Sequence, residues 1–128
     1  MDCIFCKIAN KDLPSYTIYE DMIVKVFLDI HPNADGDMLI IPNKHYETLL
    51  DIDLDTLNHI NVIAKKMYKL LQEKLKIDGL TICQNNEYGQ EIKHYHMHLT
   101  PRYDKDNVKI IFPNETSDIK DIYKKIMS

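Results

Sequence analysis

Three histidines occupy alternate positions in the segment "EIKHYHMHL" (residues 91–99), namely His94, His96 and His98. Side chains two residues apart point to nearly opposite sides of a helix, whereas they share one face of a β-strand. A helix would therefore separate the central histidine from its two neighbours. The alternation predicts a strand that presents three imidazoles on one face and ends at Pro101, because proline cannot donate a hydrogen bond to a sheet.

The rest of the chain predicts further strands and two helices. Apolar, β-branched runs bounded by turn-forming residues predict strands, and apolar residues recurring at steps of three and four predict amphipathic helices. These patterns occupy, in order, residues 22–30 (strand), 37–42 (strand), about six turns from Leu54 (helix), 79–85 (strand) and 117–127 (helix). An α+β domain is expected, in which a mostly antiparallel sheet packs with one long helix and a short terminal helix.

The size and charge of the chain exclude several classes of protein. A chain of 128 residues fits one domain with a core of its own. The net charge is -4 and no block of Lys and Arg would track a phosphate backbone, so no nucleic acid polymer is expected as a partner. No segment approaches the roughly 18 apolar residues of a membrane span, and the N-terminus lacks a signal-peptide pattern. The chain is expected to be cytoplasmic, away from membranes, with reduced cysteines.

The three histidines admit three interpretations. They could form the solvated face of a strand, although three on one face are harder to attribute to chance than one. They could bind a metal ion, but three collinear residues place the outer two too far apart to close a tetrahedron unaided. They could serve nucleophilic catalysis, because imidazole is largely neutral near pH 7 and attacks phosphorus without a separate base. The last interpretation is favoured, with the central His96 as the nucleophile.

The histidine segment, "HYHMHLT" preceded by "GQ" and followed by "PRY", resembles the His-x-His-x-His-x-x signature of the histidine triad (HIT) family of nucleotide hydrolases and transferases. The segments "CIFCKI", "FLDIHPNADGDMLIIPNKH" and "NNEYGQ" also resemble family segments, in the same order. The resemblance covers about residues 2–103 and implies a single HIT domain over residues 1–128, with 104–128 as a C-terminal extension. The Asp in "FLDI" resembles the Hint branch more than the Fhit branch, where Asn is expected.

This resemblance implies a nucleotidyl hydrolase that acts on purine nucleoside phosphoramidates and related AMP conjugates. His96 matches the residue that attacks the α-phosphorus to form a nucleotidyl-histidine intermediate, and His98 matches the neighbour that contacts phosphate oxygens. No Mg²⁺ is required, because these groups and nearby amides would hold the phosphate. The alternatives are a diadenosine polyphosphate hydrolase, as in the Fhit branch, and a non-catalytic module that binds nucleotide or zinc. The resemblance also implies a homodimer paired through the long helix and an adjoining strand.

Further residues match the nucleotide-binding positions of the family. Asp29 matches the acidic residue that binds the ribose hydroxyls, a role that suits a carboxylate because it accepts two hydrogen bonds. Gly89 and Gln90 match the turn that closes over the phosphate. Either Asn85 or Asn86 matches the Asn near the leaving group. The apolar walls around the purine are matched by Phe5, Ile8 and Ile30.

Position 91 departs from the family pattern. The residue after Gln90 is usually a small hydroxyl residue that donates to the α-phosphate, and here it is Glu91. A carboxylate repels a phosphate unless it turns away or is protonated. Glu91 therefore bears on the rate and on the preferred leaving group, and it is the best support for the non-catalytic alternative.

Cys3 and Cys6 form a C-x-x-C pair near the start of the chain. They could be two small apolar residues or a redox pair, but a thioredoxin-like pair follows a strand inside an established fold. Zinc is the stronger functional interpretation. Some HIT proteins with this pair complete a tetrahedral site with residues that match His45 and His94, which implies a structural Zn²⁺ here. The remaining candidates have simpler expectations: core packing for Cys83, and solvation for His31 and His59.

Overall fold

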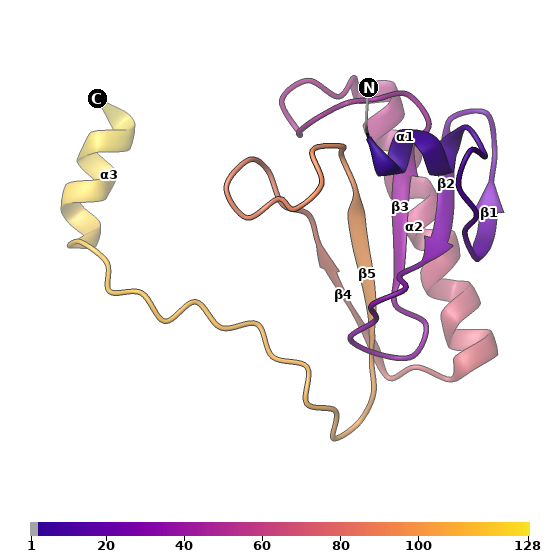
Figure 1. Cartoon of the computed structure of the whole chain (residues 1–128). Coiled ribbons are helices and arrows are strands. Elements are labelled where there is room, and N and C mark those ends of the chain that lie inside the picture. The colour runs from indigo at the N-terminus through magenta and orange to yellow at the C-terminus, as the bar shows by residue number, and fades with distance from the viewer. Residues whose placement is uncertain (1–2) are drawn as a thin grey trace.

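The computed structural model describes residues 3–128, and its centre is a five-stranded sheet whose strand order is β1-β2-β3-β5-β4. Every pair of neighbouring strands is antiparallel. The elements are α1 (Ile4–Ala9), β1 (Thr17–Glu20), β2 (Val24–Leu28), β3 (Met38–Pro42), α2 (Leu54–Leu75), β4 (Gly79–Cys83), β5 (Met97–Arg102) and α3 (Ile119–Met127). In Figure 1, α1 lies in front of the sheet and α2 lies behind it. The predicted α+β class is confirmed.

The two faces of the sheet bury alternate residues of the same strands, as the pleat requires. One face packs on α2, and its strand residues are Val24, Val26, Met38, Ile40, Met97 and Leu99. The other face packs on α1, and its cluster consists of Phe5, Ile8, Phe27, Leu39 and Ile41. The central strands are therefore covered on both sides. The smaller cluster under α1 contains the two N-terminal apolar residues that the sequence assigned to the purine wall.

The long helix α2 confirms the periodicity prediction. It follows Asp53 in the N-cap position and ends at Leu75, before the C-cap residue Lys76, whose backbone is left-handed with φ of 54°. The residues of its buried stripe are Ile60, Ile63, Ala64, Met67 and Leu71. Ile63 is fully buried in the core, so it is not available to a second copy of the chain.

The predicted strand over the histidines is correct only in its second half. β5 begins at Met97, so His94 and His96 precede it. The backbone N–H of Tyr95 donates to Tyr46 at 2.6 Å, outside the sheet, and this bond holds the preceding segment away from the ladder. β5 also continues through Pro101, where the sequence predicted its end. Pro101 pairs with β4 alone, because the residues that pair with β3 end at Leu99. Proline is tolerated where one side of a strand is unpaired.

Two short elements, α1 and β1, were not predicted. His59 is also not simply solvated, because its Nε2 lies 2.6 Å from an Asp21 carboxylate oxygen that also accepts a hydrogen bond from the Tyr19 hydroxyl. The other Asp21 oxygen accepts from the backbone N–H groups of Ile23 and Val24. This network joins α2 to the turn between β1 and β2.

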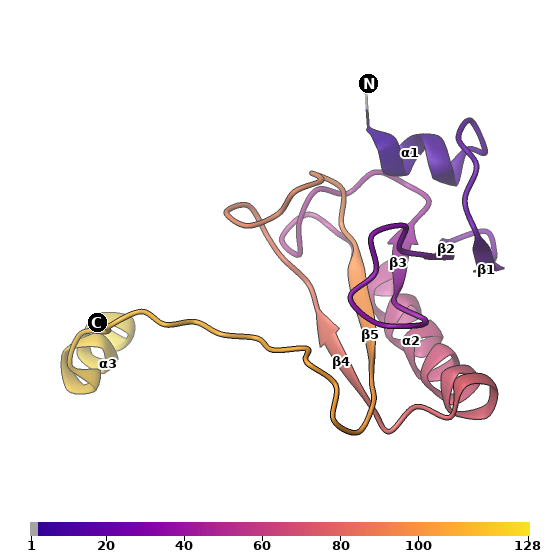
Figure 2. The same ribbon diagram turned by 60° about the horizontal axis from the view of Figure 1, so that its bottom comes forward.

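The C-terminal segment departs from the sheet after β5. Figures 1 and 2 show α3 at the end of an extended stretch, apart from the rest of the fold. Asp118 accepts a hydrogen bond from the backbone N–H of Lys120, and this cap begins the helix. The predicted terminal helix is thus confirmed, but none of its side chains is buried. Within residues 3–128, no helix is both long enough and apolar enough to cross a bilayer.

Candidate active site and metal centre

Two cysteines and two histidines from distant segments meet beside the N-terminal end of α1. The Sγ of Cys3 lies 3.4 Å from Nδ1 of His94, and the Sγ of Cys6 lies 3.2 Å from Nδ1 of His45. The two Nδ1 atoms are 3.1 Å apart, and all four candidate ligand atoms lie within 4.8 Å of one another. Ligand atoms of a tetrahedral zinc ion are separated by about 3.3–3.8 Å, given ordinary Zn–N and Zn–S bond lengths. This group can hold a metal ion.

The surroundings of this cluster determine which of its ligand atoms carry a proton. The Nε2–H of His94 donates to the Pro42 carbonyl at 2.9 Å, which leaves Nδ1 unprotonated and facing the two sulfurs. Burial lowers the pKa of His94 to about 4, so its ring is neutral near pH 7. Burial also raises the pKa of Cys6 to about 11, so this thiol stays protonated at neutral pH unless a cation binds it.

His96 is buried, two residues after His94, and a hydrogen bond to the backbone fixes its ring. Its Nδ1–H donates to the backbone carbonyl of His94 at 2.7 Å. Burial lowers the pKa of His96 below its ordinary value, so the ring is neutral and its Nε2 carries the free electron pair. The Phe5 ring packs against the imidazole with centroids 5.0 Å apart, and the His98 ring does so at 4.9 Å. The ring of His96 is thus held in one orientation with an unprotonated Nε2.

A cavity of about 610 Å³ opens in front of His96 and His98. It is large enough for a nucleotide-sized ligand. The residues that the sequence assigned to nucleotide binding and that line it are Phe5, Ile8, Asp29, Ile30, Asn85, Gly89, Glu91, His96 and His98. The structure therefore brings together side chains from the N-terminal helix, the end of β2, and the segment before β5.

Gln90 is the assigned residue that does not line this cavity. Its side chain is buried, and both ends of its amide bind backbone groups: Nε2 donates to Glu47 at 2.7 Å and Oε1 accepts from Glu87 at 3.0 Å. These bonds anchor the loop that carries Gly89, whose φ of 91° favours glycine. Gln90 thus shapes the loop side of the cavity without facing it.

The two candidate asparagines have different surroundings. The side chain of Asn86 accepts from the backbone N–H of Leu49 at 2.7 Å and exchanges hydrogen bonds with Gln84. It ties two loops together. Asn85 lines the cavity, so it is the asparagine that a bound ligand would meet.

Asp29 lies directly after β2 and is half-buried at the cavity wall. Its Oδ1 accepts the backbone N–H of His31 at 2.9 Å, which fixes the direction of the carboxylate. Carboxylates accept hydrogen bonds from paired hydroxyl groups. The position therefore suits contact with a diol such as a ribose.

Sequence reasoning missed several residues of the cavity. Phe27 and Leu39 pair across β2 and β3 and form part of its apolar wall, which their strand register could have indicated. His31 is exposed, as expected, and it also lines the cavity. No sequence pattern distinguished that histidine from a surface one.

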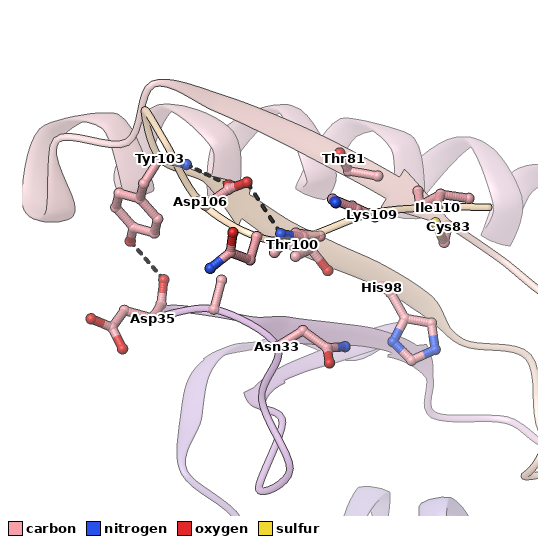
Figure 3. A pocket seen from close by; sticks show the side chains of 13 residues that line it. Asn33, Asp35, Thr81, Cys83, His98, Thr100, Tyr103, Asp106, Lys109 and Ile110 are labelled. Atoms are coloured by element: carbon pink, nitrogen blue, oxygen red, sulfur yellow. Dashed lines mark hydrogen bonds between the residues drawn. The ribbon is translucent and has the colours of Figure 1, made fainter.

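A second cavity, of about 730 Å³, lies on the far side of His98. Figure 3 shows Tyr103 and Asp35 at one end, the His98 ring toward the other, and Asn33 between them. The Tyr103 hydroxyl donates to the Asp35 carbonyl at 2.7 Å. Cys83 lines this cavity and is only half-buried, so it is not the core residue that was expected. His98 and Asn33 border both cavities.

Known proteins resemble this chain over most of its length. The family model described as the HIT domain matches residues 10–105. An adenosine 5'-monophosphoramidase of Saccharomyces cerevisiae is 37% identical over 125 residues, which cover 95% of this chain and 77% of the yeast protein.

Two crystal structures extend the similarity to the fold. A member of the HIT family of proteins from Bacillus subtilis is 32% identical, with a TM-score of 0.85 and coverage of 99% of this chain and 96% of that one. A Zn-bound histidine triad family protein from Mycobacterium smegmatis is 31% identical, with a TM-score of 0.81 and coverage of 89% and 85%.

Proposed function

Because this chain belongs to the HIT family, we propose that it is a nucleotidyl hydrolase that cleaves the P–N bond of purine nucleoside phosphoramidates and related AMP conjugates. The observation that carries this proposal is the 2.7 Å hydrogen bond from Nδ1 of His96 to the His94 carbonyl, which directs Nε2 away from that carbonyl. The yeast relative named as an adenosine 5'-monophosphoramidase supports the same substrate class.

The reaction follows from the protonation state of His96. Its Nε2 electron pair forms a bond to the α-phosphorus while the P–N bond breaks, and the leaving nitrogen keeps that bond's electrons and takes a proton from solvent. Water then attacks the phosphorus of the nucleotidyl-histidine and returns a proton to solvent, which releases AMP and restores the neutral imidazole. A preorganised nucleophile avoids the entropic cost of alignment in each turnover.

Two neighbouring groups would assist at the phosphate. The His98 ring, 4.9 Å from the His96 ring between centroids, borders the cavity and would donate to a phosphate oxygen. Asn85 would donate near the leaving group. Because hydrogen-bond donors held in place can stabilise the developing charge, the proposed reaction needs no Mg²⁺.

We propose that the cluster of Cys3, Cys6, His45 and His94 holds a structural Zn²⁺. Two sulfur and two imidazole ligands form a closed tetrahedral set, which leaves no position for substrate. When bound, the ion would supply charge that keeps the two thiols ionised. The Zn-bound relative from Mycobacterium smegmatis supports this assignment. Such a site needs reduced thiols, which fits the cytoplasmic location that we propose.

We also propose that the protein is a homodimer. The β4 strand is an edge of the sheet and exposes Ile82, and α2 exposes Val62 and Tyr68 beside its buried stripe. Uncovered edge strands and apolar side chains favour association with a second copy.

The direct experiment is hydrolysis of adenosine 5'-phosphoramidate with detection of AMP. Rapid acid quenching should reveal an adenylyl group on His96 by mass spectrometry. His96→Ala should lower kcat by about 10³-fold or more while AMP binding remains measurable. Tyr88→Ala, which removes a fully exposed side chain in the same loop, is the matched control.

Three results would redirect the proposal. Near-native activity of His96→Ala would show that another residue is the nucleophile. A higher specificity constant for diadenosine polyphosphates than for the phosphoramidate would favour the Fhit-like alternative. AMP binding without turnover of any phosphoramidate would favour the non-catalytic module.

A further inference from the structure

Glu91 presents a carboxylate to the candidate active site. It is exposed and lines the 610 Å³ cavity together with His96 and His98. None of the ion pairs formed within residues 3–128 involves it. Its charge is therefore available to a ligand in the cavity.

The fixed charges of this cavity have one sign. The acidic residues that line it are Asp29 and Glu91, and no Lys or Arg is among the described residues of its wall. A phosphate bound there meets two carboxylates. Among the described residues of the wall, the side chains that can carry a positive charge are histidines. Like charges repel one another, so an anionic substrate should bind more tightly in this cavity if it also carries a positively charged group.

The position of Glu91 indicates which part of the substrate should carry the positive charge. Asp29, at the end of β2, is where the ribose would lie, beside the apolar wall formed by Phe27 and Ile30. Glu91 instead lies in the segment before β5 and also borders an adjoining cavity, whose other charged side chains are Glu47 and Lys93. The Lys93 ammonium donates a hydrogen bond to the Glu87 carbonyl at 2.8 Å and makes no ion pair with Glu91. The carboxylate thus stands on the side of the phosphate that remains for the leaving group.

We infer that Glu91 selects substrates whose leaving group carries a positive charge, so that phosphoramidates of amines bearing a second, ammonium group are preferred over neutral or acidic ones. This inference rests on the proposed function. The ammonium would donate a charge-assisted hydrogen bond to the Glu91 carboxylate and would offset the charge of the phosphate. An acidic leaving group in the same place would meet repulsion.

The test uses three AMP phosphoramidates that differ only at the far end of the amine: those of ethylenediamine, propylamine and β-alanine. Their affinities are measured by calorimetry with His96→Ala, which prevents turnover during the titration. The ethylenediamine conjugate should bind about fivefold tighter than the propylamine conjugate, and the β-alanine conjugate about fivefold weaker. The preference should shrink as salt is raised, since these charges are accessible to solvent.

Two variants in the same background decide the role of Glu91. Glu91→Gln should bring the three affinities within about twofold of one another, and Glu91→Lys should reverse their order. Glu47→Gln removes the same charge from the adjoining cavity and should leave the ranking unchanged. Equal affinities in the presence of Glu91, or a ranking that survives Glu91→Gln, would overturn the inference.

Turnover by the wild-type protein is a separate readout. Failure to hydrolyse any of the three conjugates would refute the proposed function, whereas the binding ranking would still decide whether Glu91 selects charge. Hydrolysis of all three with equal specificity constants would retain the function and refute the selectivity.

Discussion

The backbone carbonyl of His94 accepts the Nδ1–H of His96 at 2.7 Å, while the ring of His94 belongs to the cysteine and histidine cluster. One residue therefore connects the candidate metal centre with the candidate nucleophile. The Phe5 ring, on the helix that begins between the two cysteines, packs against both imidazoles, with centroid separations of 6.0 Å and 5.0 Å. A disturbance of the cluster should reach the cavity through these contacts.

Removal of a cluster ligand should weaken nucleotide binding more than it slows the chemical step. Cys3→Ser should abolish stoichiometric metal binding, lower Tm by at least about 5 °C and raise KM more than it lowers kcat, because Phe5 loses its anchor. The measurements are metal analysis of protein purified without chelator, thermal unfolding and steady-state kinetics. Cys83→Ser, at a half-buried cysteine outside the cluster, is the control. A wild-type protein that contains no metal as purified, together with an unchanged Tm for Cys3→Ser, would contradict a structural metal.

Loss of the Gln90 amide should destabilise the protein and loosen the loop that carries Gly89. Gln90→Ala leaves the Glu47 carbonyl and the Glu87 N–H without their partner, at a cost of about 1–3 kcal/mol in the free energy of unfolding. Urea unfolding measures this cost, and KM for the phosphoramidate should rise as well. Gln72→Ala, at an exposed position on α2, should change neither quantity. An unchanged unfolding midpoint for Gln90→Ala would mean that the loop has no need of this anchor.

These residues also show where sequence reasoning was sufficient and where it was not. The stripe of α2 was predicted because its burial follows the helical period, and the strands β2 and β3 were predicted because they are continuous apolar runs that the fold buries on both faces. The start of β5 was misplaced because the bond from Tyr95 to Tyr46 is tertiary, and alternation cannot reveal it. The inward turn of Gln90 has the same origin, since its partners lie in two loops.

The cluster of cysteines and histidines could not be predicted from the spacing of its residues. The family resemblance suggested His45 and His94 as partners of the cysteines, but spacing alone did not, because these residues are up to 91 positions apart. Likewise, the contact between His59 and Asp21 spans 38 positions and joins a helix to a turn. Contacts of this kind depend on the packing of whole elements.

Acid should remove the stability that the Asp21 network provides. Burial alone would raise the pKa of Asp21, but the hydrogen bonds from His59, Val24, Ile23 and Tyr19 together lower it from 3.8 to about 2. A carboxyl whose pKa is lower in the folded state stabilises the protein above its unfolded pKa, and this stabilisation, about 2 kcal/mol, is lost as pH falls from about 4 to about 2.

The comparison with Asp21→Asn isolates this contribution. Between pH 4 and pH 2, the wild-type protein should lose about 2 kcal/mol more unfolding free energy than the variant. Denaturant titrations across this range provide the measurement. Asp104→Asn, at an exposed aspartate, should follow the wild-type curve. Parallel curves for wild type and Asp21→Asn would show that the network has no pH-linked role.

Association through α2 and the edge of the sheet gives the last prediction. Val62 and Tyr68 are 49% and 38% exposed on α2, and Ile82 is 52% exposed on β4, so each would gain from burial against a second copy. Sedimentation at micromolar concentration should give a species of about 30 kDa, twice the mass of the 15.1 kDa chain. Because a charge in such an interface is costly to bury, Val62→Lys or Tyr68→Lys should shift the population toward monomer. Lys66→Ala, at an exposed lysine on the same helix, should not, and a wild-type species of 15 kDa would refute the dimer.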